Sequence, residues 1–388
     1  MKNRGFLGLQ GLVFFLVVAA FANIYLPQPV LPILAAEFGV KEAGASLSIS
    51  LVILGIALSN LPFGMLGDRY PIRPLILVGG IAVSGASLVC ALTQHYTLLL
   101  AARFLQGLFL PALTTCVAAH LANSLPAERL NVVMGSYVSA TVVGGLGGRL
   151  LGGWLHPPLH WRYAFVSASL LLLVAVVAAI LGLPGESARP AQRRTDLGFL
   201  ELLSSWARLR IYGVAFGSYW VFSSVFNYLP FYLNGPPFQV PTQVIALLYL
   251  TYLVGAVMGP AAGRLADRIG NGATMALGVV VFGLALGGTL IGSFVAIVAS
   301  LAGICAGFFT THAAAAGALN SGLTVSRGRA NALYVLFYYA GGYAGITAGG
   351  YAYQHAGWPA VVGLGLLVLL LPLGTGLVEM GSGRKGRR

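Results

Sequence analysis

The sequence predicts an all-α integral membrane protein in which twelve transmembrane helices form two pseudo-symmetric six-helix bundles. Three observations lead to this fold class. Of the 388 residues, 58% are hydrophobic and 8% are charged, whereas about 25% of the residues of a soluble protein are charged. The apolar residues fall into runs of about 20, the length that an α-helix needs to cross a bilayer. A short charged loop occurs twice, half a chain apart, as expected for an internally repeated membrane protein.

The first bundle is expected over residues 1–183. An apolar run follows Lys2 and Arg4 and contains Ala20-Phe21-Ala22, which resembles a signal peptide with its cleavage site. The run continues to Pro32, however, and an even number of spans requires it, so we interpret it as an uncleaved first helix. The helices of this bundle are predicted at 8–34, 44–66, 75–92, 97–121, 132–154 and 162–183.

A hydrophilic stretch separates the two halves, and residues 184–208 are predicted to form a cytoplasmic linker. Four apolar residues at helical spacing predict a short amphipathic helix in this linker, on the membrane surface. These residues are Leu197, Leu200, Leu203 and Trp206. The second bundle is expected over 209–380, and 381–388 is expected as a basic cytoplasmic tail. Its helices are predicted at 210–233, 242–264, 272–293, 296–319, 330–352 and 358–378.

The basic residues indicate how the chain is oriented. The net charge is +13, and with a cytoplasmic N-terminus 18 of the 22 Lys and Arg residues lie at the inner ends and loops. This distribution follows the positive-inside rule and predicts that both termini are cytoplasmic; we expect the membrane to be a cell inner (plasma) membrane. The basic excess is therefore a signal of topology, and no nucleic-acid partner is expected. We expect a monomer whose surroundings are the lipid bilayer.

The repeated loop lies between the second and third helices and again at the same place in the second half. Asp68 and Asp267 of the two copies are 199 residues apart. The copies read Gly64-Met65-Leu66-Gly67-Asp68-Arg69-Tyr70-Pro71-Ile72-Arg73 and Gly263-Arg264-Leu265-Ala266-Asp267-Arg268-Ile269-Gly270. The first copy resembles the signature loop of the major facilitator superfamily, Gly-x-Leu-x-Asp-Arg-x-Gly-x-Arg. It departs at Pro71, where the family usually has Gly, and the second copy lacks the final Arg.

The resemblance covers almost the whole chain and implies two bundles that rock around a central site. In the family this loop locks the two halves together on the cytoplasmic side when the cavity opens outward. The implied cytoplasmic gate consists of Gly64, Asp68, Arg69, Arg73, Gly263, Asp267 and Arg268. Alternatively, the loop is a solvated turn that only sets the topology.

Arg103 falls inside a predicted span, where a charge costs about 3 kcal/mol on insertion scales and usually faces a cavity or a partner. Arg103-Phe104-Leu105-Gln106-Gly107 resembles the Arg-x-x-Gln-Gly motif of the fourth helix in the superfamily. In proton-coupled members that arginine is linked to proton movement, so Arg103 and Gln106 are candidates for the cavity. Alternatively, Arg103 is structural and binds the backbone or the first helix.

Arg149 interrupts a glycine-rich motif of the fifth helix. Gly144-x-x-x-Gly148-Arg149-x-x-Gly152-Gly153 resembles the antiporter motif of the superfamily, in which a proline occupies the position of Arg149. The glycines allow close contact between helices. The replacement removes a kink and adds a buried charge, which favours a role in substrate binding.

The two arginines are predicted to share one depth in the membrane, because Arg103 lies near the outer start of its helix and Arg149 near the outer end of its own. Two cations at one level suit an organic anion. In the alternative, backbone carbonyls satisfy each guanidinium, or Arg149 extends to the outer interface.

The acidic residues are informative because none of the nine falls in the middle of a predicted span. Many drug/proton exchangers carry an embedded acid, and Glu37, at the outer end of the first helix, is the nearest candidate or else a plain loop acid. A histidine can also carry a proton near neutral pH. His312, and His120 near the inner end of the fourth helix, are the options, although a lone histidine is more often structural.

Other polar and aromatic residues inside predicted spans are candidates for a cavity lining, because such groups suit a mixed apolar and polar ligand. They are Asn23, Tyr25, Gln28, Tyr219, Asn227, Tyr228, Tyr338 and Tyr339. Alternatively, the tyrosines near helix ends belong to the interfacial aromatic belt.

The sequence contains no phosphate-binding loop, nucleophile elbow or metal-binding cluster, so neither a cofactor nor a metal is expected and an enzyme is not indicated. The leading hypothesis is a secondary active transporter that resembles the drug/proton antiporter branch and exports small amphipathic compounds in exchange for protons. One alternative is uptake or exchange of an organic anion bound by Arg103 and Arg149. Another is a membrane sensor that does not transport.

Overall fold

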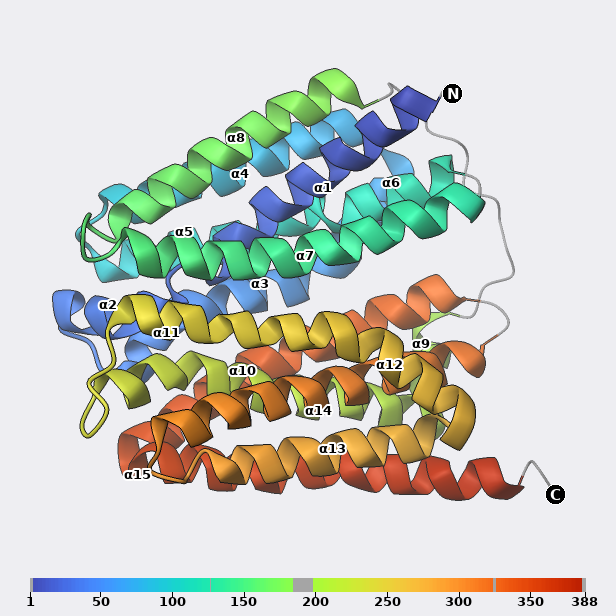
Figure 1. Ribbon diagram of the computed structural model, residues 1–388. Coiled ribbons are helices and arrows are strands. Elements are labelled where there is room, and N and C mark those ends of the chain that lie inside the picture. Colours follow the sequence, from blue (N-terminus) through green and yellow to red (C-terminus); the bar gives the residue numbers. More distant parts are fainter. Residues whose placement is uncertain (1–2, 126, 184–197, 324–325, 386–388) are drawn as a thin grey trace. The chain divides into compact units, whose positions relative to one another are not determined.

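The computed structural model describes residues 3–125, 127–183, 198–323 and 326–385, and the regular elements in these ranges are all helical (Figure 1). The chain divides into two compact units. Unit 1 contains Met1–Val40, Leu47–Gln192 and Pro241–Tyr249. Unit 2 contains Lys41–Ser46, Arg193–Val240 and Leu250–Arg388.

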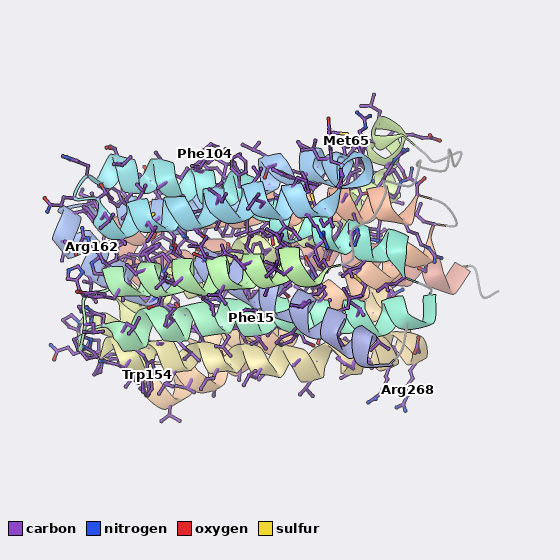
Figure 2. All side chains as sticks on the ribbon, turned by 90° about the horizontal axis from the view of Figure 1, so that it is seen from above. Phe15, Met65, Phe104, Trp154, Arg162 and Arg268 are labelled. Atoms are coloured by element: carbon purple, nitrogen blue, oxygen red, sulfur yellow. The ribbon has the colours of Figure 1, made fainter. Side chains whose placement is uncertain are left out.

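Unit 1 is built mainly from the first half of the sequence. Its helices are α1 (Asn3–Tyr25), the 3₁₀ turn η1 (Gln28–Val30), α2 (Leu31–Phe38), α3 (Glu42–Arg69), α4 (Ile72–Leu92), α5 (Tyr96–Leu113), α6 (Thr115–Ser124), α7 (Ala127–Leu155), α8 (Arg162–Gly182) and α11 (Thr242–Leu248). The first residues of α3 are grouped with unit 2. Figure 2 shows Met65 and Arg162 near opposite ends of this unit, so its long helices run between the ends that carry the two residues.

Unit 2 is built mainly from the second half of the sequence. Its elements are α9 (Phe199–Ser204), α10 (Trp206–Asn234), η2 (Tyr249–Tyr252), α12 (Leu253–Ile269), α13 (Asn271–Gly288), α14 (Phe294–Ser321) and α15 (Arg327–Lys385). The backbone of α15 is not helical at Ala356 and Gly357, and Gly357 has a φ of 64° that favours glycine. α15 is therefore two helices joined at a sharp bend, as predicted at 330–352 and 358–378.

The helices of the described ranges account for the predicted membrane spans. Nine candidate spans are long and apolar enough to cross a membrane, and the last of them, Arg327–Gly381, contains both helices of α15. α7 and α10 complete the predicted set, because each has 29 residues but a less apolar sequence than the nine. The predicted helix ranges are confirmed to within a few residues, apart from the breaks described below.

The two units repeat the same packing scheme. In unit 1, α1 packs along α7, and α4 packs against both α5 and α8 (Figure 1). In unit 2, α10 packs along α15, and α13 packs against both α14 and α15. The corresponding helices are those that a repeat of half a chain would place at equivalent positions, so the repeat in the sequence is also a repeat of structure.

A ladder of glycines explains the closest of these contacts in each unit. A Cβ atom at Gly148 would lie 2.1 Å from the carbonyl oxygen of Ala22, and one at Gly345 would lie 2.1 Å from that of Trp220. Only glycine permits such an approach of two helices. The same contact with a carbonyl oxygen recurs at Gly144 on Val18, Gly152 on Leu26 and Gly341 on Phe216, whereas a Cβ atom at Gly349 would meet the side chain of Ser224.

Three predicted spans are broken. α1 ends at Tyr25 and the chain continues through Pro27 and η1 into α2, because proline has no N–H to continue the helical hydrogen bonds. The span at 97–121 divides into α5 and α6, with Pro111 in the last turn of α5. The span at 242–264 contains the 3₁₀ turn η2 between α11 and α12.

The linker and the tail differ in extent from the expectation. The described helix of the linker is α9, from Phe199 to Ser204, and it ends because Ser205 is extended with φ −85° and ψ 114°. Trp206 therefore begins α10, and Leu197 lies outside the described residues. At the other end α15 continues to Lys385, into the segment expected as a tail, and 386–388 lie outside the described residues.

Candidate functional site

Arg103 binds the broken end of α1. Its side chain is 0% exposed, and Nη1 donates a hydrogen bond of 2.7 Å to the carbonyl oxygen of Asn23. In a continuous helix this carbonyl would accept from the residue four positions later, which is Pro27 and has no N–H. Nη2 also donates to the carbonyl of Ile24, and Nε donates to that of Ser48 at 2.7 Å. Arg103 therefore supplies the donors that the break removes.

Side chains from neighbouring helices extend this contact into a buried polar network. Nη1 of Arg103 also donates to Oε1 of Gln106 at 2.6 Å, and the Gln106 amide lies 3.4 Å from the carbonyl of Val83 in α4. Oδ1 of Asn23 accepts a bond of 3.0 Å from the Ser87 hydroxyl. The network joins α1, α3, α4 and α5, and it contains Asn23, Arg103 and Gln106, three of the predicted cavity residues.

Arg149 binds the next residues of the same broken segment. It is 3% exposed, and its Nε donates a bond of 2.7 Å to Oε1 of Gln28 while Nη1 donates to the carbonyl of Gly145. The guanidinium carbon lies 4.0 Å from the ring centroid of Tyr25 and 5.0 Å from that of Tyr249. Arg149 is thus held between two aromatic rings, an arrangement that stabilises a cation away from water.

The two arginines bind adjacent parts of one short segment. Arg103 donates hydrogen bonds to the carbonyls of Asn23 and Ile24. Arg149 lies over the ring of Tyr25 and donates a hydrogen bond to Gln28. The predicted common depth of the two arginines in the membrane stays a prediction. Their partners are carbonyls, amide oxygens and ring faces of the protein itself.

A second group of predicted residues lies in an aromatic cluster of unit 2. The rings of Tyr219 and Tyr338 stack with centroids 3.7 Å apart, and those of Phe222 and Phe308 stack at 4.0 Å. Nδ1 of His312 lies 3.0 Å from the hydroxyl of Tyr334. His312 is also ring-stacked on Phe308 and lies against Tyr338. α10, α14 and α15 thus bring one histidine and several aromatic rings together.

Part of this cluster is accessible. Tyr338, Tyr339 and His312 are partly exposed, whereas Tyr219 and Phe308 are buried. The members that sequence reasoning missed are Phe222, Phe308 and Tyr334. The spacing of Tyr334 and Tyr338, four residues apart on one helix face, was the available signal.

Asn227 and Tyr228 have packing partners within unit 2. The Asn227 amide donates a bond of 2.7 Å to the hydroxyl of Ser46, and the Tyr228 hydroxyl donates one of 2.8 Å to the carbonyl of Ile346. These bonds fasten α10 to the start of α3 and to α15. Neither residue belongs to the aromatic cluster around His312.

The loop residues assigned to a gate lie in different surroundings. Arg73 donates bonds of 3.2 and 2.5 Å to the carbonyl of Leu183, the residue that ends α8. A cation at this position also interacts favourably with the helix dipole. Arg69, Asp267 and Arg268 are exposed, and the Asp68 side chain lies outside the described residues. The gate therefore stays a prediction, and Arg73 has a structural contact in addition.

Glu37 is part of an ion-paired cluster at the other end of unit 1. Its carboxylate accepts hydrogen bonds from the Arg162 guanidinium and the Trp161 indole, and His160 lies 3.6 Å away. Arg162 also donates to the carbonyl of Thr93 at 2.8 Å. The cluster joins α2 to the start of α8 and to the end of α4.

Comparison with known proteins identifies the family of this chain. The family model described as Major Facilitator Superfamily matches residues 13–315 and 238–378. This chain belongs to the major facilitator superfamily. It is similar to an uncharacterized MFS-type transporter, YybF, of Bacillus subtilis (strain 168), with 28% identity over 91% of this chain and 88% of the relative. It is also similar to the inner membrane transport protein YnfM of Escherichia coli (strain K12), with 29% identity over 92% and 86%.

A solved structure has the same fold. The crystal structure of a bacterial homolog of the human lysosomal transporter Spinster, in an inward-facing and unoccupied conformation, covers 99% of both chains with a TM-score of 0.76 and 14% identity. As a superfamily member, the chain is a multi-pass membrane transporter of small molecules and not an enzyme. The predicted fold class, two bundles of transmembrane helices, is confirmed.

Proposed function

We propose that this transporter exports small amphipathic compounds in exchange for protons. The observation that carries the proposal is the aromatic cluster around His312 in unit 2. Ring faces with hydroxyl groups at their edges suit a ligand that is apolar with a cationic or polar end. The resemblance of the Arg103-x-x-Gln106-Gly107 motif to that of proton-coupled members of the superfamily supports the same assignment.

The proton would be carried by His312. It lies in the cluster, and none of the acidic residues falls in the middle of a predicted span, so this imidazole is the group assigned to bind a proton beside the ligand. Tyr334 holds one ring nitrogen at 3.0 Å, which orients the ring. If a proton and a cationic ligand compete for this cluster, binding of one releases the other. Proton/ligand exchange then does not require an embedded carboxylate.

The organic-anion alternative is less well supported by the contacts in unit 1. Arg103 donates to four acceptors of the protein, three of them backbone carbonyls. Arg149 is engaged by Gln28, Gly145 and two tyrosine rings. An anion would have to displace these partners. We therefore assign both arginines to holding the broken α1 segment in shape.

The test uses full-length protein in liposomes that contain a pH-sensitive dye, with no imposed pH gradient. Ethidium is added outside as the lipophilic cation and benzoate as the organic anion, and protein-free liposomes are the control. The proposal expects ethidium to raise the internal pH, because ethidium enters as protons leave. His312→Gln is expected to abolish this signal while retaining ethidium binding.

Other outcomes contradict the proposal. A pH change with benzoate alone, lost in Arg149→Gln, would establish the anion carrier instead. Ethidium uptake without any pH change would remove proton coupling. No transport with a folded protein that binds neither probe would contradict the substrate class.

We also expect the protein to act as a monomer in the inner membrane, with both termini in the cytoplasm. The distribution of basic residues supports this orientation. Single cysteines introduced in the loops, labelled with an impermeant maleimide in intact cells, test it directly.

A further inference from the structure

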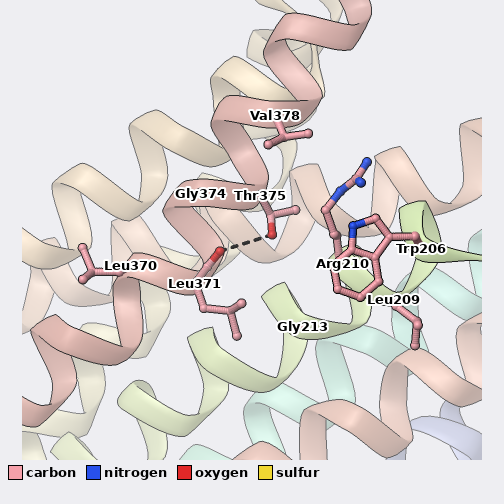
Figure 3. Close-up of a pocket in the computed structure, with 9 residues that line it drawn as sticks. All are labelled: Trp206, Leu209, Arg210, Gly213, Leu370, Leu371, Gly374, Thr375 and Val378. Carbon is pink, nitrogen blue, oxygen red and sulfur yellow. Dashed lines mark hydrogen bonds between the residues drawn. The ribbon is translucent and has the colours of Figure 1, made fainter.

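A groove of about 330 Å³ lies in unit 2 between the start of α10 and the end of α15 (Figure 3). It is lined by Trp206, Leu209, Arg210, Gly213, Leu370, Leu371, Gly374, Thr375 and Val378. From Leu370 to Val378 the groove follows α15 for about 12 Å, at 1.5 Å per residue. None of its lining residues belongs to the His312 cluster or takes part in the proposed transport chemistry.

Most of the groove is apolar and open to the surroundings of the protein. Leu370 is 59% exposed and Leu371 is 50% exposed. In a membrane helix such side chains face lipid. Two of the lining residues, Gly213 and Gly374, are glycines and add no side chain to the wall. A Cβ atom at Gly374 would have no atom within 4 Å, so this position faces open space. The walls therefore fit a hydrocarbon chain.

One end of the groove is polar and carries both signs of charge. Nη2 of Arg210 donates a bond of 2.8 Å to the carboxylate of Glu379, and both side chains are about one-fifth exposed. Nε of Arg210 is buried and has no hydrogen-bond partner among the described residues. Trp206, 70% exposed, is four residues before Arg210 on α10, and both side chains line the groove (Figure 3). An indole next to a cation at a helix end is typical of the headgroup level of a bilayer.

These features specify a lipid with two charges. A guanidinium has five N–H donors. Arg210 donates one hydrogen bond to Glu379, and a phosphate could accept from other N–H groups of the same guanidinium. A carboxylate accepts from an ammonium group while it stays paired with arginine. A purely anionic headgroup would meet the Glu379 charge without compensation. The pair is neutral overall and complements a zwitterion.

We propose that this groove binds a phospholipid whose headgroup carries a phosphate and a primary ammonium, the phosphatidylethanolamine class. Arg210 takes the phosphate, Glu379 accepts the ammonium N–H groups, Trp206 packs at the glycerol level, and one acyl chain follows Leu370, Leu371 and Val378. The site would tie the end of α15 to the start of α10 at the membrane surface.

The experiment is native mass spectrometry of the purified full-length protein. It is mixed with equal amounts of phosphatidylethanolamine, its N-methyl and N,N-dimethyl derivatives, phosphatidylcholine and phosphatidylglycerol of identical acyl chains. One lipid is expected to remain bound, with about a tenfold preference for the primary ammonium over phosphatidylcholine, as one charge-assisted hydrogen bond would give. The preference should decline with each added methyl group, and this series requires no variant.

Two variants locate the site. Glu379→Gln is expected to bring the preference for phosphatidylethanolamine over phosphatidylcholine down to about onefold, because the ammonium loses its charged acceptor. Gly374→Leu fills the groove and is expected to remove the bound lipid of every class. Gly363→Leu is the matched control, since Gly363 is an exposed glycine of the same helix with nothing within 4 Å and lies outside the groove.

Several outcomes would overturn the proposal. Equal retention of all five lipids by the wild type excludes headgroup recognition, and a preference for phosphatidylglycerol makes the site anionic rather than zwitterionic. Unchanged binding in Gly374→Leu places the lipid elsewhere. A doubled mass that Gly374→Leu abolishes would mean that a second copy of the chain covers the groove. The readout is binding, so it is independent of whether ethidium or benzoate is transported.

Discussion

The Arg103 guanidinium donates a hydrogen bond of 2.7 Å to the backbone carbonyl of Asn23. The carbonyl needs this donor because Pro27, four residues later, cannot provide an N–H. Inside a membrane an unsatisfied carbonyl costs several kcal/mol, so a break in a helix has to be met by neighbouring side chains. The broken helix supplies the buried arginine with acceptors, and the arginine supplies the free carbonyls with donors. Transporters commonly place their binding sites at interrupted helices.

Replacing Arg103 by alanine is therefore expected to destabilise the protein. The change leaves at least three carbonyls in the core without their donor, and a loss of about 3 kcal/mol or more is expected from bonds to a charged group. Thermal unfolding in detergent should show that the Tm of Arg103→Ala is several degrees below that of the wild type. The Tm of Arg103→Lys should lie between those of the wild type and Arg103→Ala. Arg264→Ala, at an exposed arginine, is the control and should leave Tm unchanged. An unaltered Tm in Arg103→Ala would refute the capping role.

The glycine ladder predicts a sharp contrast between two neighbouring glycines of α7. Gly148→Ala would place a Cβ 2.1 Å from the Ala22 carbonyl oxygen and push α1 away, at a cost of about 3 kcal/mol. Gly147→Ala meets nothing within 4 Å and is expected to be neutral or slightly stabilising. Tm and the yield of monodisperse protein measure both effects. Equal behaviour of the two variants would show that α1 and α7 do not pack this closely.

Arg149→Gln tests whether this cation binds substrate. The variant loses the guanidinium between Tyr25 and Tyr249 and the donor to Gln28, so a lower Tm is expected. Ethidium-driven proton movement per folded molecule should stay within about twofold of the wild type, because the ligand is assigned to the aromatic cluster. A selective loss of benzoate transport would instead favour the anion carrier.

Tyr334→Phe removes the hydroxyl that lies 3.0 Å from Nδ1 of His312. The phenyl ring of the variant would keep the packing, so ethidium binding should be unchanged. Proton movement should fall several-fold and its dependence on pH should change, because the imidazole loses its orienting partner. Tyr351→Phe, at a tyrosine 68% exposed on the same helix, should have neither effect. A normal pH profile in Tyr334→Phe would count against a proton on His312.

Glu37→Gln separates the ion-paired cluster from proton coupling. Glu37 is partly exposed and bound by Arg162 and Trp161, so its loss should cost only about 0.2–1 kcal/mol. Ethidium-driven proton movement should be retained, and Arg162→Gln should reproduce the small change in stability. Abolished proton movement in Glu37→Gln, with intact ethidium binding, would transfer the proton-carrying role from His312 to Glu37.

Much of the fold follows from local pattern. Hydrophobic runs of span length, two copies of a charged loop and the glycine spacing in α7 are periodic features that a sequence displays directly. Contacts between residues of different helices leave no periodic pattern in the sequence. Sequence reasoning therefore missed Ser87, Tyr334 and Tyr249, although it found Arg103 and Arg149. A buried charge is conspicuous in an apolar run, whereas the neutral group that it contacts is not.

The sequence by itself determined that the chain crosses a membrane repeatedly, that its two halves are related, and that Arg103 and Arg149 are buried cations in need of partners. The tertiary structure alone decided what those partners are, because hydrogen bonds join residues far apart in the chain, such as Arg149 and Gln28, which are 121 positions apart. It also decided that Arg73 caps α8 and that His312 meets Tyr334. Composition and period depend on neighbours along the chain, whereas a binding environment depends on which helix faces pack together.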